Sequence, residues 1–210
     1  MFLISPQVGC FRQGEILSNL IQLHVDASSL EDPEGPSFEE KTHPFALILT
    51  QDCDLDWDFK ARTTEIREDT RQRKQLPNIL FCELFEVETL KPQYVSNLWQ
   101  RISRNQDERF HYITACHDQQ DRKGTGLPVL VADFKRIFSI PTDELYKRVS
   151  SGLERRTTLS VPFLQDLANR FGCYLLRVAL PSHDQLPPVI GPTATLLLEA
   201  RPIAPKPQHE

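Results

Sequence analysis

The segment ALILTQDCDLDWD, residues 46–58, carries the densest group of side chains that could do chemistry. After an apolar run of buried-strand type, aspartates stand at every second position around Cys53: Asp52, Asp54, Asp56 and Asp58. Alternate residues of an extended strand project to the same side, so a strand that continues past Gln51 would gather all four carboxylates on one face. Crowded carboxylates repel one another and favour a cation. The pattern indicates a divalent-metal site with Asp54 and Asp56 as ligands; the alternative is a strand that ends at Gln51 and a solvated acidic turn.

The thiols favour other roles. The neighbouring aspartates disfavour a thiolate at Cys53, and the face of the predicted strand that it shares with Leu55 and Trp57 is apolar, so we expect Cys53 to pack inward. Cys116 has His117 beside it and Arg122 and Lys123 nearby, which favours a thiolate and makes a redox-responsive protein a second alternative function. An odd set of five cysteines without a CxxC pair indicates reduced thiols and no disulfide-linked partner.

Other metal patterns are incomplete. Asp54, Asp56, Asp58 and Glu65 have EF-hand spacing, but Phe59 stands where the turn glycine is required. No two of the cysteines and histidines have the short spacing of a readable zinc site. Asp133 and Lys135, near the end of an apolar strand and preceded by Asp118 and Asp121, resemble the acid and D-x-K pattern of a metal-dependent nuclease superfamily.

The segment RFHYI adds a cation and a titratable group. In a strand, Arg109 and His111 share one face, and the aromatic residues Phe110 and Tyr112 take the other. The alternative is an ordinary amphipathic strand with its aromatic side inward. We expect the aspartate segment and this strand to lie together in the fold and to form one candidate site. Its residues are Asp52, Cys53, Asp54, Asp56, Arg109 and His111. A metal-dependent hydrolase or nuclease that uses this site is the first alternative function.

A basic cluster follows the aspartates and predicts partner binding. It could contact phosphates or an acidic protein, although interspersed acids also fit a solvated face. Its members are Lys60, Arg62, Arg67, Arg71, Arg73 and Lys74. With no complete catalytic motif in the chain, the preferred function is a module that binds a protein or a nucleic acid, and the cofactor stays unknown.

Periodicity predicts the elements that must position these residues. Strands are expected over residues 13–25, bent near Ser18 and Asn19, and over 45–51, 78–90, 109–116 and 127–140. Residues 26–44 read as a loop and 59–77 as an exposed helix or loop, while 93–108 contain a short amphipathic helix. A strong helical pattern runs from a Ser160 cap to residue 181. These elements predict an α+β domain over 1–181, a curved antiparallel sheet or small β-barrel closed by the C-terminal helix, with a proline-rich extended tail over 182–210.

Composition limits the class of protein. The 210 residues are 40% apolar with a formal net charge of −5, which suits one globular domain and argues against coating nucleic acid by bulk charge. No apolar stretch is long enough for a membrane span, and the first residues lack the features of a secretory signal. We expect a cytoplasmic protein without a membrane partner.

Two resemblances add to these expectations. QGEIL followed by HPFALILTQ resembles the opening of MazF/PemK-type barrels, with His43 at the usual basic position. That likeness implies a small β-barrel and not ribonuclease activity, because the catalytic residues of the family cannot be placed on this chain. The phrases LTQDCDL, RFHYI and PFLQDLANRFGCYLLRVALP are similar to uncharacterised bacterial proteins. The second likeness supplies no chemistry. The absence of a complete catalytic motif, the basic segment 60–74 and the apolar proline-rich tail favour a bacterial binding module within a stress or phage-defence system.

Overall fold

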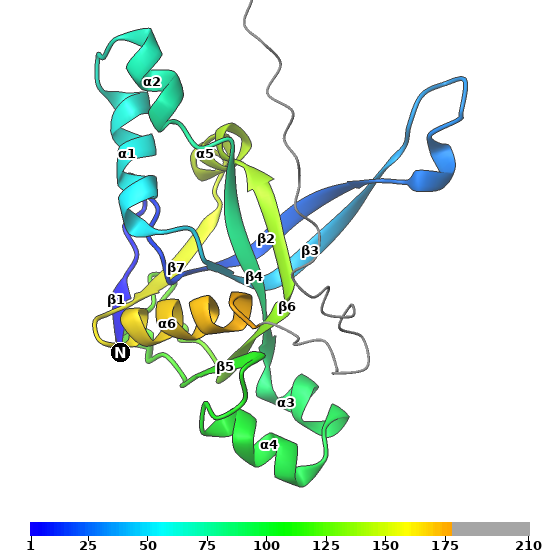
Figure 1. Cartoon of the computed structure of the whole chain (residues 1–210), viewed down its shortest axis with the longest axis vertical. Helices are drawn as coiled ribbons and strands as arrows, with labels where there is room; N and C mark the ends of the chain where they lie inside the picture. The colour runs from blue at the N-terminus through cyan, green and yellow to red at the C-terminus, as the bar shows by residue number, and fades with distance from the viewer. Residues whose placement is uncertain (178–210) are drawn as a thin grey trace, which may run out of the picture. The chain divides into compact units, whose positions relative to one another are not determined.

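The computed structural model describes residues 1–177, in which seven strands form one curved antiparallel sheet (Figure 1). In spatial order the strands are β1 (Phe2–Ile4), β7 (Glu154–Leu159), β2 (Glu15–Val25), β3 (Phe38–Ile48), β4 (Asn78–Glu86), β6 (Leu130–Pro141) and β5 (Phe110–Ile113). The sheet does not close into a barrel, because its two edge strands, β1 and β5, do not pair with each other. The predicted α+β class with a curved antiparallel sheet is confirmed, and the barrel form of that prediction does not occur.

Six α-helices of the described residues accompany the sheet: α1 (Asp52–Thr63), α2 (Glu68–Lys74), α3 (Val87–Leu90), α4 (Ser96–Ser103), α5 (Thr142–Ser150) and α6 (Phe163–Leu175). Short 3-10 turns lie at Ala27–Ser29, Lys91–Gln93 and Asp118–Gln120. Within residues 1–177 we find no helix with the length and apolar character that crossing a membrane requires.

Both faces of the central sheet are buried, which explains the unbroken apolar run in β3. Leu47 packs with α6 residues such as Leu167 in one core, whereas its neighbours Ala46 and Ile48 pack with Leu55 of α1 in the other. Successive side chains of a strand point to opposite faces, so a strand covered on both sides needs apolar residues at every position. The predicted C-terminal amphipathic helix, α6, covers one of these faces.

Several boundaries differ from those expected. β3 begins at Phe38 inside the predicted loop, because residues 38–43 pair with β2 in register. α6 begins at Phe163 rather than after a Ser160 cap; the Ser160 hydroxyl instead donates to the Met1 carbonyl at 3.0 Å. α5 and β7 were not expected at all. The predicted tail over 182–210 and the last residues of the predicted helix lie outside the described residues.

Candidate protein-binding arm

The aspartate segment is helical, so the prediction of a strand past Gln51 is wrong. Gln51 is extended and α1 starts at Asp52, where early carboxylates interact favourably with the positive end of the helix dipole. Alternate residues of a helix lie about 200° apart, so the four aspartates do not share a face. Asp52 accepts the Gln13 backbone N–H at 2.8 Å, and the Asp58 side chain is fully buried.

The basic cluster is largely neutralised by the acids within it. Lys60 pairs with Asp56 at 2.6 Å, and the Arg62 Nε donates to both oxygens of Asp58 at 2.8 and 2.9 Å. Further ion pairs join Arg62 to Asp143, Arg67 and Arg73 to Asp69, and Arg71 to Glu68. Seven acidic and six basic residues lie between positions 52 and 74, so this segment offers no excess of positive charge to a nucleic acid.

Arg109 and His111 are engaged away from the aspartates of α1. The Arg109 Nε donates to the Asp133 Oδ1 at 2.7 Å, in a two-pronged pair with a buried carboxylate. His111 is 2% exposed beneath α6, and its Nδ1 has no hydrogen-bond partner among the described residues. Burial, reinforced by the nearby positive charge of Arg170, lowers the pKa of His111 to about 4. A neutral buried imidazole of this kind favours a structural role.

The metal patterns of the sequence do not assemble within residues 1–177. No group of three His, Cys, Asp or Glu side chains there has the geometry to hold an ion. Asp133 of the D-x-K pattern accepts Arg109, and Asp121 accepts Arg156 through two hydrogen bonds of 2.6 and 2.7 Å. These carboxylates therefore already have cationic partners within the chain.

All five cysteines are free thiols, but their burial differs from that expected. Cys53 is exposed on α1, with its Sγ 3.7 Å from the Gln51 Oε1, so the predicted inward packing is wrong. Cys116 is buried, and burial raises the pKa of its thiol, which opposes the thiolate expected there. Burial also raises the pKa of the Cys82 thiol well above its usual value.

Brief alkylation of the native protein is expected to label Cys53 and Cys173, which are exposed, and to leave Cys82 unmodified. Peptide mass spectrometry measures the labelled fraction of each thiol, and the same reaction in denaturant labels all five as the control. Equal labelling of Cys82 and Cys53 in the native state would contradict this burial pattern.

Beyond the seven-stranded part of the sheet, β2 and β3 continue as a long two-stranded arm. β7 pairs with β2 only as far as Ser18, and β4 pairs with β3 only from Phe45, so within the described residues 1–177 no third strand pairs with residues 20–43. Figure 1 shows this arm projecting from the sheet. At its base Asn19 has φ 54°, opposite Pro44, which marks the bend expected near Ser18 and Asn19. A two-stranded ribbon alone is only marginally stable in water, so contacts at its base matter.

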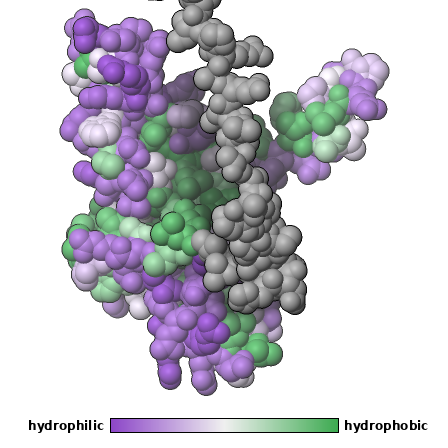
Figure 2. Space-filling model, viewed as in Figure 1, coloured by the Kyte–Doolittle hydropathy of each residue, from purple (hydrophilic) through white to green (hydrophobic). Residues whose placement is uncertain are grey.

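One face of the arm is mostly apolar and exposed, with Glu40 as its charged residue. Val25 lies opposite Phe38 and Leu23 lies opposite Glu40, and paired residues of antiparallel strands project to the same side. Leu23, Val25 and Phe38 are 51%, 49% and 62% exposed, and Leu30 at the tip is 63% exposed. Figure 2 shows apolar surface along the arm with hydrophilic surface beside it. Contiguous exposed apolar side chains on a projecting element are typical of an interaction surface.

The arm is also strongly acidic. Residues 26–40 contain six acidic and no basic residues: Asp26, Glu31, Asp32, Glu34, Glu39 and Glu40. Asp26 accepts the Ser28 N–H at 2.9 Å, and the hydrogen bonds from Ser28 lower the pKa of Asp26. The Ser37 N–H donates to the Ser29 hydroxyl at 2.7 Å across the tip. The arm thus ends in a hydrogen-bonded loop that presents carboxylates.

The opposite, polar face anchors the arm to the sheet. His43 is fully buried, with its Nδ1 3.0 Å from the Glu83 Oε1 and its Nε2 3.0 Å from the Gln22 Oε1. Its ring stacks on Phe138 with centroids 3.9 Å apart, and burial lowers the pKa of His43. Lys41 pairs with Glu83 at 2.7 Å. These contacts fix the base of the arm and leave its apolar face open.

Residue pattern alone does not predict the arm, because the proline, serine, glycine and acidic residues of 26–44 have the composition of a loop. The available signal was the apolar, β-prone stretch LIQLHV followed, after an acidic, proline-containing turn, by the mostly polar stretch SFEEK with Phe38 in it. We compared the chain with the models of known protein families, and none of them matches it. A search of curated proteins also gives no match.

Proposed function

We propose that this chain is a bacterial partner-binding module that docks a protein on the apolar face of its β2–β3 arm. The observation that carries this proposal is the exposed stripe of Leu23, Val25 and Phe38 on an arm whose opposite face is anchored. Burying each such side chain in a complex stabilises it by up to about 1.5–3 kcal/mol. An anchored arm also loses little conformational freedom on binding.

The charge of the arm defines the chemistry of the partner. Six carboxylates lie between residues 26 and 40, so a second copy docked face to face would bring like charges together. The same charge excludes a nucleic-acid backbone from this surface. The proposed partner is therefore a protein with an apolar strand or groove bordered by lysine or arginine side chains.

A synthetic peptide of alternating leucine and lysine tests this surface. We expect it to bind the wild-type protein, and we expect Phe38→Ser to weaken that binding roughly tenfold, because the loss of one large apolar contact costs more than about 1.4 kcal/mol. Fluorescence anisotropy of the labelled peptide measures the Kd, and added salt should raise it.

Two controls give this experiment its specificity. Trp57→Ser removes another exposed aromatic side chain, 53% exposed on α1, and should leave the Kd unchanged. A peptide of alternating leucine and glutamate should not bind. Equal binding of the two peptides, or wild-type affinity in Phe38→Ser, would refute the proposed surface. A concentration-dependent dimer that Phe38→Ser abolishes in light scattering would assign the arm to a second copy instead.

A further inference from the structure

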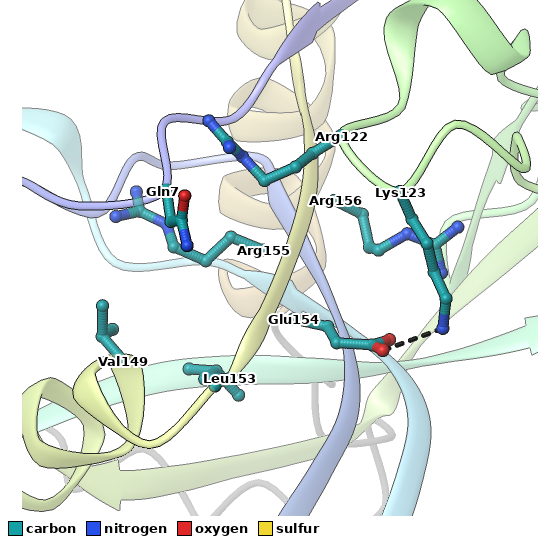
Figure 3. A pocket seen from close by; sticks show the side chains of 9 residues that line it. Gln7, Arg122, Lys123, Val149, Leu153, Glu154, Arg155 and Arg156 are labelled. Carbon is teal, nitrogen blue, oxygen red and sulfur yellow. Dashed lines mark hydrogen bonds and ion pairs between the residues drawn. The ribbon is translucent and has the colours of Figure 1, made fainter.

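The outer edge of β2, on the side away from β3, loses its neighbouring strand where the arm begins. β7 pairs with β2 as far as Ser18, which lies opposite Glu154, the first residue of β7. The Ser18 hydroxyl donates to the Glu154 carboxylate at 2.6 Å, and Lys123 pairs with the same carboxylate at 2.8 Å at this end of the strand (Figure 3). Among residues 1–177 no strand pairs with the outer edge of β2 beyond this point.

Two hydrogen bonds show which backbone groups of the arm face this outer edge. The Asp26 N–H donates to the Ser37 carbonyl at 3.0 Å and continues the register of the β2–β3 ladder. Alternate residues of an antiparallel strand direct their N–H and C=O groups to opposite sides, so the odd-numbered residues of β2 in the arm face outward. The Arg148 guanidinium agrees with this direction, because it donates from α5 to the Ile21 carbonyl.

Leu23 and Val25 leave their outward backbone groups open. Within the described part of the chain, no side chain and no other strand bonds to the N–H or C=O of either residue on this side. An unpaired strand edge is a template for a further strand. The outer edge of β2 therefore offers two N–H donors and two C=O acceptors directly beside the apolar face of the arm.

The two edges of the arm differ in charge. Residues 20–25 of β2 contain no Asp, Glu, Lys or Arg, whereas Glu39, Glu40 and Lys41 follow one another along β3. Charged side chains on an edge strand discourage the addition of another strand. Strand addition is therefore favoured at β2 and disfavoured at β3, and the carboxylates of the arm disfavour an acidic strand at either edge.

We propose that the partner docks as an extended strand, which pairs antiparallel with the outer edge of β2 at Leu23 and Val25. This inference rests on the proposed function and specifies its partner: a polypeptide segment with apolar side chains at alternate positions and lysine or arginine between them. Directly bonded residues of an antiparallel pair project to the same face. The apolar residues of the partner therefore lie beside Leu23 and Val25, and their own N–H groups bond to β2.

Methylation of alternate backbone nitrogens of the leucine–lysine peptide tests this arrangement. A peptide methylated at its leucine nitrogens loses the N–H groups that face β2, and we expect its Kd to rise roughly tenfold, since two backbone hydrogen bonds are lost. A peptide methylated at its lysine nitrogens keeps those groups and should have the Kd of the unmethylated peptide. Equal Kd values for the two methylated peptides, or the reverse order, would overturn antiparallel strand addition.

Proline substitutions at one position of the ladder test the edge from the side of the protein. Leu23 and Glu40 lie opposite each other, and their N–H groups face opposite edges of the arm, so neither proline removes a bond of the β2–β3 ladder. Leu23→Pro should raise the Kd severalfold above that of Leu23→Ala, which loses the side chain alone. Glu40→Pro should have the Kd of Glu40→Gln. Equal effects of the two prolines would contradict the assignment to β2.

Phe38→Ser distinguishes a failure of this inference from a failure of the proposed function. Phe38 belongs to the apolar face of the arm but lies on β3, so it contributes no backbone group to the outer edge of β2. If Phe38→Ser weakens binding of the unmethylated peptide while both methylated peptides bind equally, the docking surface stands and strand addition is wrong. If Phe38→Ser binds like the wild type, the docking surface itself is wrong.

Discussion

Replacing Arg155 by methionine is expected to lower the free energy of unfolding by about 3–5 kcal/mol. Arg155 is 2% exposed, and its guanidinium donates to both oxygens of the buried Glu15 at 2.6 and 2.9 Å. It also satisfies the carbonyls of Gly9 and Cys10. Without the arginine, Glu15 is a buried carboxylate with no cation, which is costly because its charge has lost its water as well as its partner. Urea denaturation measures the change.

Two further variants separate charge from packing. Glu15→Leu together with Arg155→Met removes the unpaired buried charge and should recover part of the loss. The residual cost is that of the two freed carbonyls and of the Arg12 backbone N–H, which donates to Glu15 at 3.1 Å in the wild type. Lys60→Met breaks an exposed pair, in which Lys60 is 66% exposed, and should change the free energy of unfolding by less than about 1 kcal/mol. Similar losses for Lys60→Met and Arg155→Met would contradict the role of burial.

Acidification from pH 6.5 to pH 4 is expected to remove about 3 kcal/mol of stability through His111 alone, at roughly 1.4 kcal/mol for each unit of pKa difference. The pKa of His111 is lowered from 6.5 to about 4 in the folded chain. Below pH 6.5 the unfolded chain therefore binds a proton that the folded chain does not, so the contribution is full above pH 6.5, declines as the pH falls, and is constant below about 4.

His111→Leu tests this linkage. The substitution should flatten the fall in unfolding free energy between pH 6.5 and 4, because leucine cannot take up a proton in the unfolded state. It loses no Nδ1 hydrogen bond to the described residues. His117→Leu, at an exposed histidine, is the matched control and should keep the wild-type pH dependence. Urea denaturation across this pH range measures both, and an unchanged acid slope in His111→Leu would contradict the buried neutral imidazole.

Most of the sheet and its covering helix could be predicted from residue periodicity. Burial of apolar side chains produces the apolar runs of β3, β4 and β6 and the helical repeat of α6. Each of these patterns is visible within its own segment of the sequence. β7 could not be found in this way, because most of the side chains that its strand ERRTTL buries are polar, two of them arginines, and Leu159 is its only apolar residue. Their partners Glu15 and Asp121 are distant in sequence, so only the fold shows that these charges can be buried.

The aspartate segment shows how a local sequence pattern can predict a strand where the chain forms a helix. The alternating acids predict a strand, yet Asp56 with Lys60 and Asp58 with Arg62 have the i, i+4 spacing of helical ion pairs. Asp56 and Asp58 therefore bind cations of their own helix, in place of Arg109 and His111. The charge pattern of the sequence indicates that the carboxylates need cationic partners, but the tertiary structure decides which cations they contact.

The sequence by itself determined the α+β class, the main strands and the amphipathic C-terminal helix, because burial of apolar side chains imposes its period on the chain. Only the tertiary structure decided which charges are paired, which thiols are exposed and that residues 20–43 leave the sheet as an arm. Ion pairing and exposure depend on contacts between distant segments, and their energies depend on the dielectric surroundings that only the fold creates. The exposed apolar face of the arm belongs to this second class.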